Sequence, residues 1–195
     1  MTVAIGTACC VAAGEEVAGD EAVVVRQPPW VLIGLADGLG HGPLAAQAAS
    51  AFCRYVEDHA SMPLEDLLTG AGEHIASTRG AAAALLRIDE SAGELEFSGV
   101  GNIAMKAITR TAMPIFCSAG ILGRRVRRLR SFRFPISPGD VVLLHSDGIA
   151  SGFDLAAFRD LDPEVMARRI VDVHKKSFDD ATCVVAVLRD NRTSA

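Results

Sequence analysis

The sequence predicts an α+β fold in which two mostly antiparallel sheets stack on each other and are flanked by helices. Short segments rich in β-branched residues recur along the chain, and several are joined by turn-like pieces too short to hold a crossover helix. Segments such as WVLIGLA (30–36) and DVVLLH (140–145) are apolar on both sides, so both faces of their strands must be covered. Stacked sheets with outer helices provide that cover.

The strand candidates are defined by their β-branched content and by the turns between them. The pieces QPP (27–29), ESAG (90–93) and VGN (100–102) predict hairpins rather than regular βαβ units. The predicted strands are Val3–Val11, Ala22–Arg26, Trp30–Ala36, Ala81–Ile88, Leu95–Val100, Ile103–Thr109, Val141–His145 and Thr182–Leu188.

Three segments have helical spacing of apolar residues. Pro43–His59 is rich in alanine and begins with a proline suited to a first helical turn, and Leu64–Thr78 follows it closely. Glu164–Lys175 comes directly after Pro163 and is the third. The small residues of the first helix indicate close packing against a sheet.

Composition bounds the class of protein. The 195 residues are 50% hydrophobic, which is enough for one packed domain, and we expect a single domain over residues 1–195. The net charge of −5 does not favour a nucleic-acid partner. Five cysteines, odd in number and without a C-x-x-C pair, indicate reduced and buried thiols.

A signal peptide has a basic segment before its apolar stretch, and the start of this sequence has none. No apolar run approaches the roughly 18 residues that span a bilayer. We therefore expect a cytoplasmic protein with no membrane partner. No coiled-coil heptads are present, and we expect a monomer.

Two apolar strands each end in an Asp-Gly pair, at Asp37–Gly38 and Asp147–Gly148. A buried strand holds its last residue rigidly, and the glycine after it lets the backbone turn and leaves its carbonyl open to a ligand. This arrangement suits metal ligands. Asp-Gly is also an ordinary turn signal, and the pairs taken alone leave that interpretation open.

Further carboxylates stand at strand ends. Asp179 and Asp180 precede the last predicted strand, and Asp20 precedes the second. Carboxylates brought together raise one another's pKa unless a cation neutralises them. Such hard oxygen ligands suit Mg²⁺ or Mn²⁺ with several retained waters.

The ordered set of motifs resembles the SpoIIE-type branch of the PP2C (PPM) serine/threonine phosphatases. The resemblance covers nearly the whole chain and is greatest to stand-alone phosphatases of the bacterial stressosome. It rests on GD (19–20), ADGLGHG (36–42), VGN (100–102), HSDGI (145–149) and DDAT (179–182).

The resemblance implies a PP2C-like αββα sandwich with a centre of two divalent cations, Mn²⁺ or Mg²⁺. Asp37 would bridge the two cations and the carbonyl of Gly38 would bind one of them. Asp147 and Asp179 would complete the shell of the other cation, and Asp20 would orient bound water. Asp180 stands where many relatives carry asparagine, so its role is secondary.

The implied activity is hydrolysis of phosphoserine or phosphothreonine by a metal-activated water, with phosphorylated STAS-domain proteins of the stressosome as substrates and partners. No phosphoenzyme is needed, and the chain has no G-x-S-x-G element. Two alternatives stay open: an inactive PP2C-like module that binds phosphorylated partners, and a phosphoesterase acting on small molecules. Loss of a ligand aspartate would favour the first, and an enclosed pocket would favour the second.

One position departs from the family pattern. Eukaryotic PP2C enzymes carry a histidine two residues after the first aspartate, as an acid for the leaving alkoxide, whereas this chain has Leu39 there. His41 lies two residues further on and is the nearest replacement. Without one, water would protonate the leaving group and turnover would be slow.

Two rival sites are less favoured. Gly38, Gly40 and Gly42 form G-x-G-x-G, but the spacing is not that of a dinucleotide loop and Asp37 would repel a pyrophosphate. Zinc binding at His145 lacks a neighbouring cluster of ligands, which favours a packed, hydrogen-bonded histidine.

A basic run stands out in this acidic chain. GRRVRRLRSFR (123–133) indicates either a solvated loop with an edge strand or a docking site for a phosphorylated or acidic protein. It has no tyrosine or tryptophan for base stacking, so nucleic acid is disfavoured. The docking candidates are Arg124, Arg125, Arg127 and Arg128.

Overall fold

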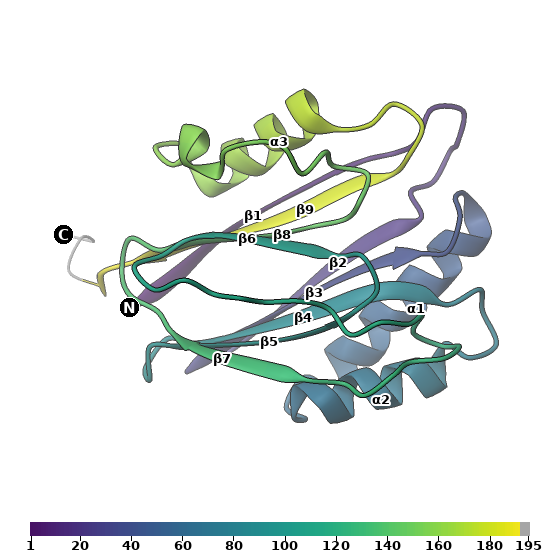
Figure 1. The fold of residues 1–195 in the computed structure, drawn as a ribbon, viewed down its shortest axis with the longest axis horizontal. Coiled ribbons are helices and arrows are strands. Elements are labelled where there is room, and N and C mark those ends of the chain that lie inside the picture. The colour runs from purple at the N-terminus through teal and green to yellow at the C-terminus, as the bar shows by residue number, and fades with distance from the viewer. Residues whose placement is uncertain (192–195) are drawn as a thin grey trace.

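The structure is a computed structural model that describes residues 1–191, and it is built from nine strands, three α-helices and one 3₁₀ helix within that range (Figure 1). The strands are β1 (Thr2–Cys10), β2 (Asp20–Gln27), β3 (Trp30–Gly38), β4 (Ala81–Asp89), β5 (Glu94–Val100), β6 (Ala104–Ile108), β7 (Ser131–Pro135), β8 (Val141–His145) and β9 (Ala181–Arg189). The helices are α1 (Pro43–Asp58), α2 (Leu64–His74), η1 (Leu155–Phe158) and α3 (Pro163–His174).

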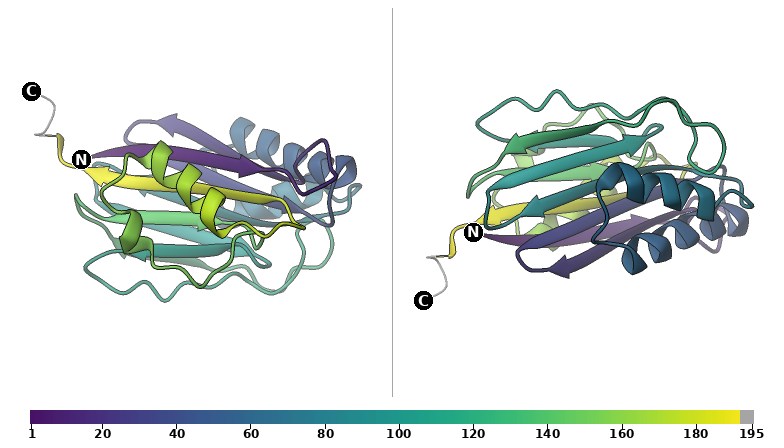
Figure 2. Two further views of the ribbon diagram at one scale, coloured as in Figure 1. Left: turned by 90° about the horizontal axis from the view of Figure 1, so that it is seen from above. Right: turned by 90° about the horizontal axis from the view of Figure 1, so that it is seen from below.

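The strands form two sheets that stack face to face. One sheet has the order β1-β9-β8-β6 and the other has the order β2-β3-β4-β5-β7, and every ladder between these strands is antiparallel. α3 covers the outer face of the four-stranded sheet, and α1 and α2 cover the outer face of the other sheet (Figure 2). The predicted αββα architecture is confirmed.

Alternation along the strands explains the layers. In β3, Leu32 and Ala36 pack under α1 and α2, whereas Val31, Ile33 and Leu35 pack between the sheets. Both sets are fully or almost fully buried. A strand buried on both faces must be apolar at every position, which is the pattern that the sequence shows.

The predicted strands and helices all occur, with bounds shifted by a few residues. One predicted connection is wrong: VGN (100–102) does not close a hairpin, because β5 and β6 belong to different sheets. The chain crosses between the layers there, and local turn chemistry does not distinguish a crossing from a hairpin. The sequence also did not assign the bounds of β7, which pairs with β5 at the edge of its sheet.

The thiol prediction needs one correction. All five cysteines are free, but only Cys53 and Cys183 are buried, and Cys9 is exposed. β1 lies at the edge of its sheet, so its outer positions face solvent. None of the helices in residues 1–191 is long and apolar enough to cross a membrane.

Candidate metal centre

Asp20 and Asp37 lie opposite each other on neighbouring strands. They are register partners in the β2–β3 ladder. Asp37 continues the row of β3 residues that points between the sheets, and Asp20 continues the matching row of β2, which includes Ala22 and Val24. Both carboxylates are thus held at the end of the central apolar layer.

The glycine after Asp37 is required by close packing. A Cβ on Gly38 would lie 2.1 Å from the backbone oxygen of Ala45, in the first turn of α1. α1 can therefore lie directly against the end of β3 only if this residue has no side chain. Gly42, just before α1, adopts a positive φ of 71° that reverses the chain into the helix.

The second Asp-Gly pair follows the same principle. A Cβ on Gly148 would lie 1.8 Å from the backbone oxygen of Asp180. The loop after β8 therefore packs directly against the start of β9, which brings Asp147 next to the Asp179–Asp180 pair. Asn102, from the crossing between the sheets, donates a hydrogen bond of 2.6 Å to Asp147 Oδ2.

Three of the predicted ligands face one pocket. Its volume is about 300 Å³, and it lies at the end of the sandwich where β3 and β8 finish and β9 begins. The lining residues are Asp37, Leu39, Gly40, His41, Ala82, Asn102, Asp147, Phe178 and Asp179. Asp20 is buried and does not line this pocket; it lines a separate cavity with Cys9 and Thr182.

Asp180 has a structural role. Its side chain is buried, and its two oxygens accept hydrogen bonds from the backbone N–H groups of Ala12 (2.9 Å) and Gly19 (2.8 Å). The carboxylate thereby fixes the loop between β1 and β2, which carries Asp20 into position. An asparagine oxygen would accept only part of this pattern.

The carboxylates raise one another's pKa. Burial, followed by the charges of Asp20, Asp147 and the Asp179–Asp180 pair, raises the pKa of Asp37 to about 8. Burial is also the main cause that raises the pKa of Asp20 to about 7, with the charge of Asp180 adding to it. The pKa of Asp179 is raised by desolvation and by Asp147. The pocket therefore favours positive charge.

The donor set fits hydrated divalent cations. The Oδ2 atom of Asp20 is buried and has no hydrogen-bond partner, so it is available to a bound ion or water. Within residues 1–191, no three His, Cys, Asp or Glu side chains are gathered tightly enough to form a complete cage for one ion. Mg²⁺ needs only one or two carboxylates, because it keeps several waters, so open spacing around a pocket suits it.

Sequence reasoning gave no role to two residues that hold Asp147. Asn102 was visible within VGN but was read as part of a turn. Lys176 donates from Nζ to the backbone oxygen of Asp147, and its charge lowers the pKa of Asp179. Nothing in the sequence marks Lys176, because its contact depends on how the α3–β9 loop packs.

His41 and His145 have different surroundings. His41 lines the pocket, and its Nδ1 contacts the Glu15 carboxylate. His145 is buried on the α3 side of β8, where Nδ1 lies 2.8 Å from the Ser146 oxygen and the ring faces Phe153. Burial lowers the pKa of His145. Its burial and its hydrogen bond agree with the packed, hydrogen-bonded histidine expected from the sequence.

The raised pKa values predict how metal-free stability depends on pH. The pKa values of Asp20 and Asp37 in the folded state, about 7 and about 8, lie above the unfolded value of about 3.9. Their contribution to the free energy of unfolding is therefore full below about pH 4 and is lost as the pH rises through 7 to 8. We expect Asp37→Asn to reduce this loss, since an amide carries no charge.

The measurement is thermal unfolding in a chelator at about pH 5.5 and about pH 8. The melting temperature of the wild type should fall more between these two pH values than that of Asp37→Asn, by about 5 °C. The variant should keep its secondary structure. An equal fall in both proteins would show that Asp37 is not held in a repulsive cluster.

The fold is that of PP2C-type protein phosphatases, as the sequence motifs implied. The PP2C phosphatase domain of SpoIIE from Bacillus subtilis superposes with a TM-score of 0.76 at 20% identity, covering 96% of this chain and 64% of that one. The model of the family described as Stage II sporulation protein E (SpoIIE) matches residues 29–189. The chain belongs to this SpoIIE family.

Individual relatives point to one branch of the family. Phosphoserine phosphatase RsbX of Bacillus subtilis (strain 168) is 24% identical over 141 residues, which is 70% of this chain and 69% of RsbX. A crystal structure of RsbX with magnesium has a TM-score of 0.83 at 21% identity and covers 94% of both chains. A structure from work on the bacterial stressosome and secondary messenger signalling has a TM-score of 0.92 at 30% identity, covering 95% of this chain and 100% of that one.

Proposed function

We propose that the protein is a metal-dependent phosphatase that hydrolyses phosphoserine or phosphothreonine on phosphorylated STAS-domain proteins of a stressosome. The observation that carries the proposal is the convergence of Asp37, Asp147 and Asp179 on one open pocket. A binding module without activity would not need to keep three unneutralised carboxylates together, because their repulsion destabilises the fold.

Each residue of the pocket has a proposed task. Asp37 and the carbonyl of Gly38 would hold one cation, and Asp37, Asp147 and Asp179 would hold a second together with retained waters. When bound, two divalent cations would lower the pKa of a water and offset the charge on the phosphate oxygens. Asp20, the register partner of Asp37, would orient water through its unpartnered oxygen.

Other residues keep this arrangement in place. Asn102 and Lys176 hold Asp147 by its side chain and backbone, respectively. Such supporting contacts fix the orientation of metal ligands. Leu39 has no proton to donate, so His41 is the side chain of the pocket wall that can protonate a leaving serine oxygen.

The substrate assignment is supported by the relatives. RsbX is described as a phosphoserine phosphatase, and a structure with a TM-score of 0.92 comes from work on the stressosome. The pocket is also open to solvent, which suits a phosphorylated side chain presented by a protein better than a small molecule that must be enclosed. We also propose a cytoplasmic location, which the similarity to RsbX supports.

The direct test is phosphate release from a purified, phosphorylated STAS-domain protein, with Mn²⁺, with Mg²⁺ and with a chelator. Release with either cation and none with the chelator supports the proposal. A folded, metal-supplied protein that binds the phosphoprotein without releasing phosphate would instead identify the inactive binding module.

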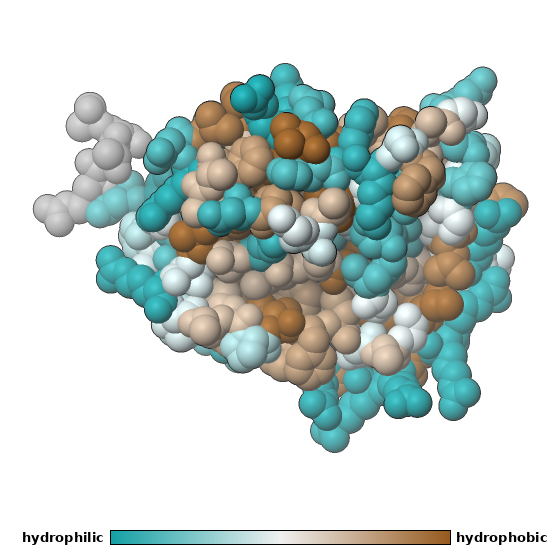
Figure 3. Space-filling model, turned by 45° about the horizontal axis from the view of Figure 1, so that its top comes forward, coloured by the Kyte–Doolittle hydropathy of each residue, from teal (hydrophilic) through white to brown (hydrophobic). Residues whose placement is uncertain are grey.

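We propose that the protein acts as a monomer. The nine exposed large apolar side chains of residues 1–191 are spread over several elements and loops, and the apolar area in the middle of the face shown in Figure 3 is bordered by charged side chains. Obligate dimers bury extensive apolar surface, typically about 2,000 Å² or more. Sedimentation of the purified protein would test this.

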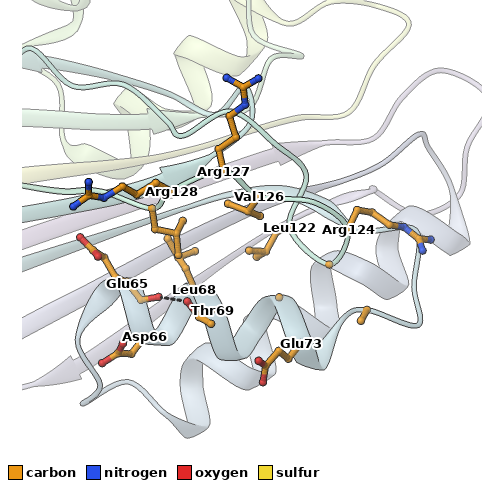
Figure 4. A pocket seen from close by; sticks show the side chains of 14 residues that line it. Glu65, Asp66, Leu68, Thr69, Glu73, Leu122, Arg124, Val126, Arg127 and Arg128 are labelled. Atoms are coloured by element: carbon orange, nitrogen blue, oxygen red, sulfur yellow. Dashed lines mark hydrogen bonds between the residues drawn. The ribbon is translucent and has the colours of Figure 1, made fainter.

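A groove of about 570 Å³ lies between α2 and the basic run, and it supports a docking role (Figure 4). Leu68, Leu122 and Val126 form its apolar floor, while Arg124 and Arg128 lie at its opposite ends. No salt bridge joins the acidic residues of α2 to these arginines within the described part of the chain. The acidic residues of α2 therefore do not neutralise these arginines, and the charge of Arg128 can meet an acidic or phosphorylated partner.

The four docking candidates do not share one environment. Arg124 donates from Nη2 to the Thr78 oxygen (2.6 Å) and from Nε to the Arg79 oxygen (3.3 Å), so it holds the backbone after α2. Arg125 does not line the groove, whereas Arg127 and Arg128 do. The guanidinium groups of Arg127 and Arg128 are exposed and make no hydrogen bond or salt bridge within residues 1–191.

The docking proposal predicts a split between substrates. Replacing Arg127 and Arg128 with alanine should raise KM for a phosphoprotein about three- to tenfold, because exposed charges steer and hold an acidic partner. Hydrolysis of a small aryl phosphate should hardly change, since it does not reach the groove. Steady-state kinetics on both substrates measures the split.

Arg169→Ala, an exposed arginine on α3, is the matched control and should leave both substrates unaffected. An equal effect of the groove variant on both substrates would argue against docking.

A further inference from the structure

Large apolar side chains are exposed at nine positions of the described chain, and two of these line the metal pocket. Leu39 is 39% exposed, and Phe178 is the most exposed of the nine at 76%. The remaining seven lie outside this pocket.

These two residues sit directly beside the candidate ligands. Leu39 comes two positions after Asp37, and Phe178 immediately precedes Asp179. Leu39 follows β3 of the five-stranded sheet, and Phe178 precedes β9 of the four-stranded sheet. The pocket therefore has an apolar side chain contributed by each half of the sandwich.

Phe178 differs from Phe116, the other exposed phenylalanine among the large exposed apolar residues of the described chain. Phe116, which is also exposed, packs edge-on against Phe132 at 4.8 Å and lies near Arg130. Phe178 has no aromatic or cation–π partner in residues 1–191. Removing an exposed phenyl ring from water is favourable, so the ring can contribute to binding when a ligand fills the pocket.

Leu39 has a fixed position. Its backbone N–H donates to the Gly80 oxygen at 2.9 Å, which ties the loop to the start of β4. The side chain is thus held on the pocket wall at the place where a proton donor would stand in eukaryotic relatives. An apolar group there can bind substrate but cannot take part in proton transfer.

We propose that Leu39 and Phe178 form an apolar rim that selects phosphorylated segments with apolar residues next to the phosphoserine. This inference rests on the proposed function and adds the local sequence of the substrate to it. A phosphorylated side chain that enters the pocket brings its neighbours along the chain against the rim. Apolar neighbours then cover the phenyl ring and the leucine, whereas polar neighbours would lose water contacts without compensation.

The test uses two phosphoserine peptides that differ only in the residues on either side of the phosphoserine, leucine in one and glutamine in the other. With Mn²⁺ present, the wild type should hydrolyse the leucine peptide with a kcat/KM about tenfold higher. In Phe178→Ala and in Leu39→Ala that ratio should fall toward one. Fluorescence anisotropy of labelled peptides compares the affinities of the protein for the two peptides. This comparison can be made even if turnover is slow.

Phe116→Ala removes an exposed aromatic ring outside the pocket and should keep the wild-type ratio. Mn²⁺ affinity, measured for all variants, should be unchanged if the rim acts on substrate rather than on the ligands. Equal hydrolysis and equal binding of the two peptides by the wild type would overturn the rim while leaving the phosphatase intact. A preference for the leucine peptide that survives in both rim variants would also overturn the rim. If the protein binds the peptides but releases phosphate from neither, the phosphatase function alone would be overturned.

Discussion

Asp147→Asn should lower metal-dependent phosphate release from an aryl phosphate by about a hundredfold or more, while the protein stays folded. The Asp147 carboxylate lines the pocket with Asp37 and Asp179, and an amide oxygen carries no charge with which to hold a cation. Lys176 contacts the backbone of residue 147, and an amide oxygen at this position can still accept the hydrogen bond from Asn102. The loss should therefore appear in activity and metal affinity and not in secondary structure.

Asp160→Asn is the matched control, since Asp160 is an exposed carboxylate outside the pocket. Release should be measured with Mn²⁺ or Mg²⁺ over a range of concentrations, beside circular dichroism of each variant. Full activity in Asp147→Asn would contradict the assignment of this carboxylate. Recovery at high metal concentration would show that the residue acts through affinity.

Gly148→Ala should produce the largest loss of stability. The added Cβ would lie 1.8 Å from the backbone oxygen of Asp180, which is far inside van der Waals contact, and neither atom is at the end of a flexible side chain. The loop after β8 and the start of β9 would have to separate. We expect a loss of about 3 kcal/mol in the free energy of unfolding, or about 6 to 12 °C in melting temperature.

Gly152→Ala provides the control within the same loop region, because a Cβ there would meet nothing within 4 Å. Its melting temperature should stay close to that of the wild type. The Gly148 variant should also bind metal more weakly, since Asp147 and Asp179 move apart. Wild-type stability in Gly148→Ala would show that the two segments are not packed directly.

Much of the fold followed from local pattern. β3 is apolar up to Asp37 and β8 is apolar up to His145, and this pattern requires cover on both faces whatever the topology. The hairpin predicted at residues 100–102 is wrong, because a glycine turn has the same sequence pattern whether the next strand joins the same sheet or the opposite one. The pairing partner of β6 lies far along the chain, in β8, and no local signal encodes it.

The candidate site divides in the same way. Asp37 and Asp147 are marked in the sequence because each follows an apolar segment and precedes a glycine, and the residue type alone makes each a candidate ligand. Three features follow only from the tertiary structure. Asp20 faces Asp37, Asp180 accepts hydrogen bonds from the β1–β2 loop, and Arg124 donates hydrogen bonds to backbone carbonyls. The sequence by itself determined the residue types and their order at strand ends, whereas the three-dimensional packing decided which of them meet. The reason is that contacts between distant segments depend on sheet register and loop packing, which residue type and spacing do not specify.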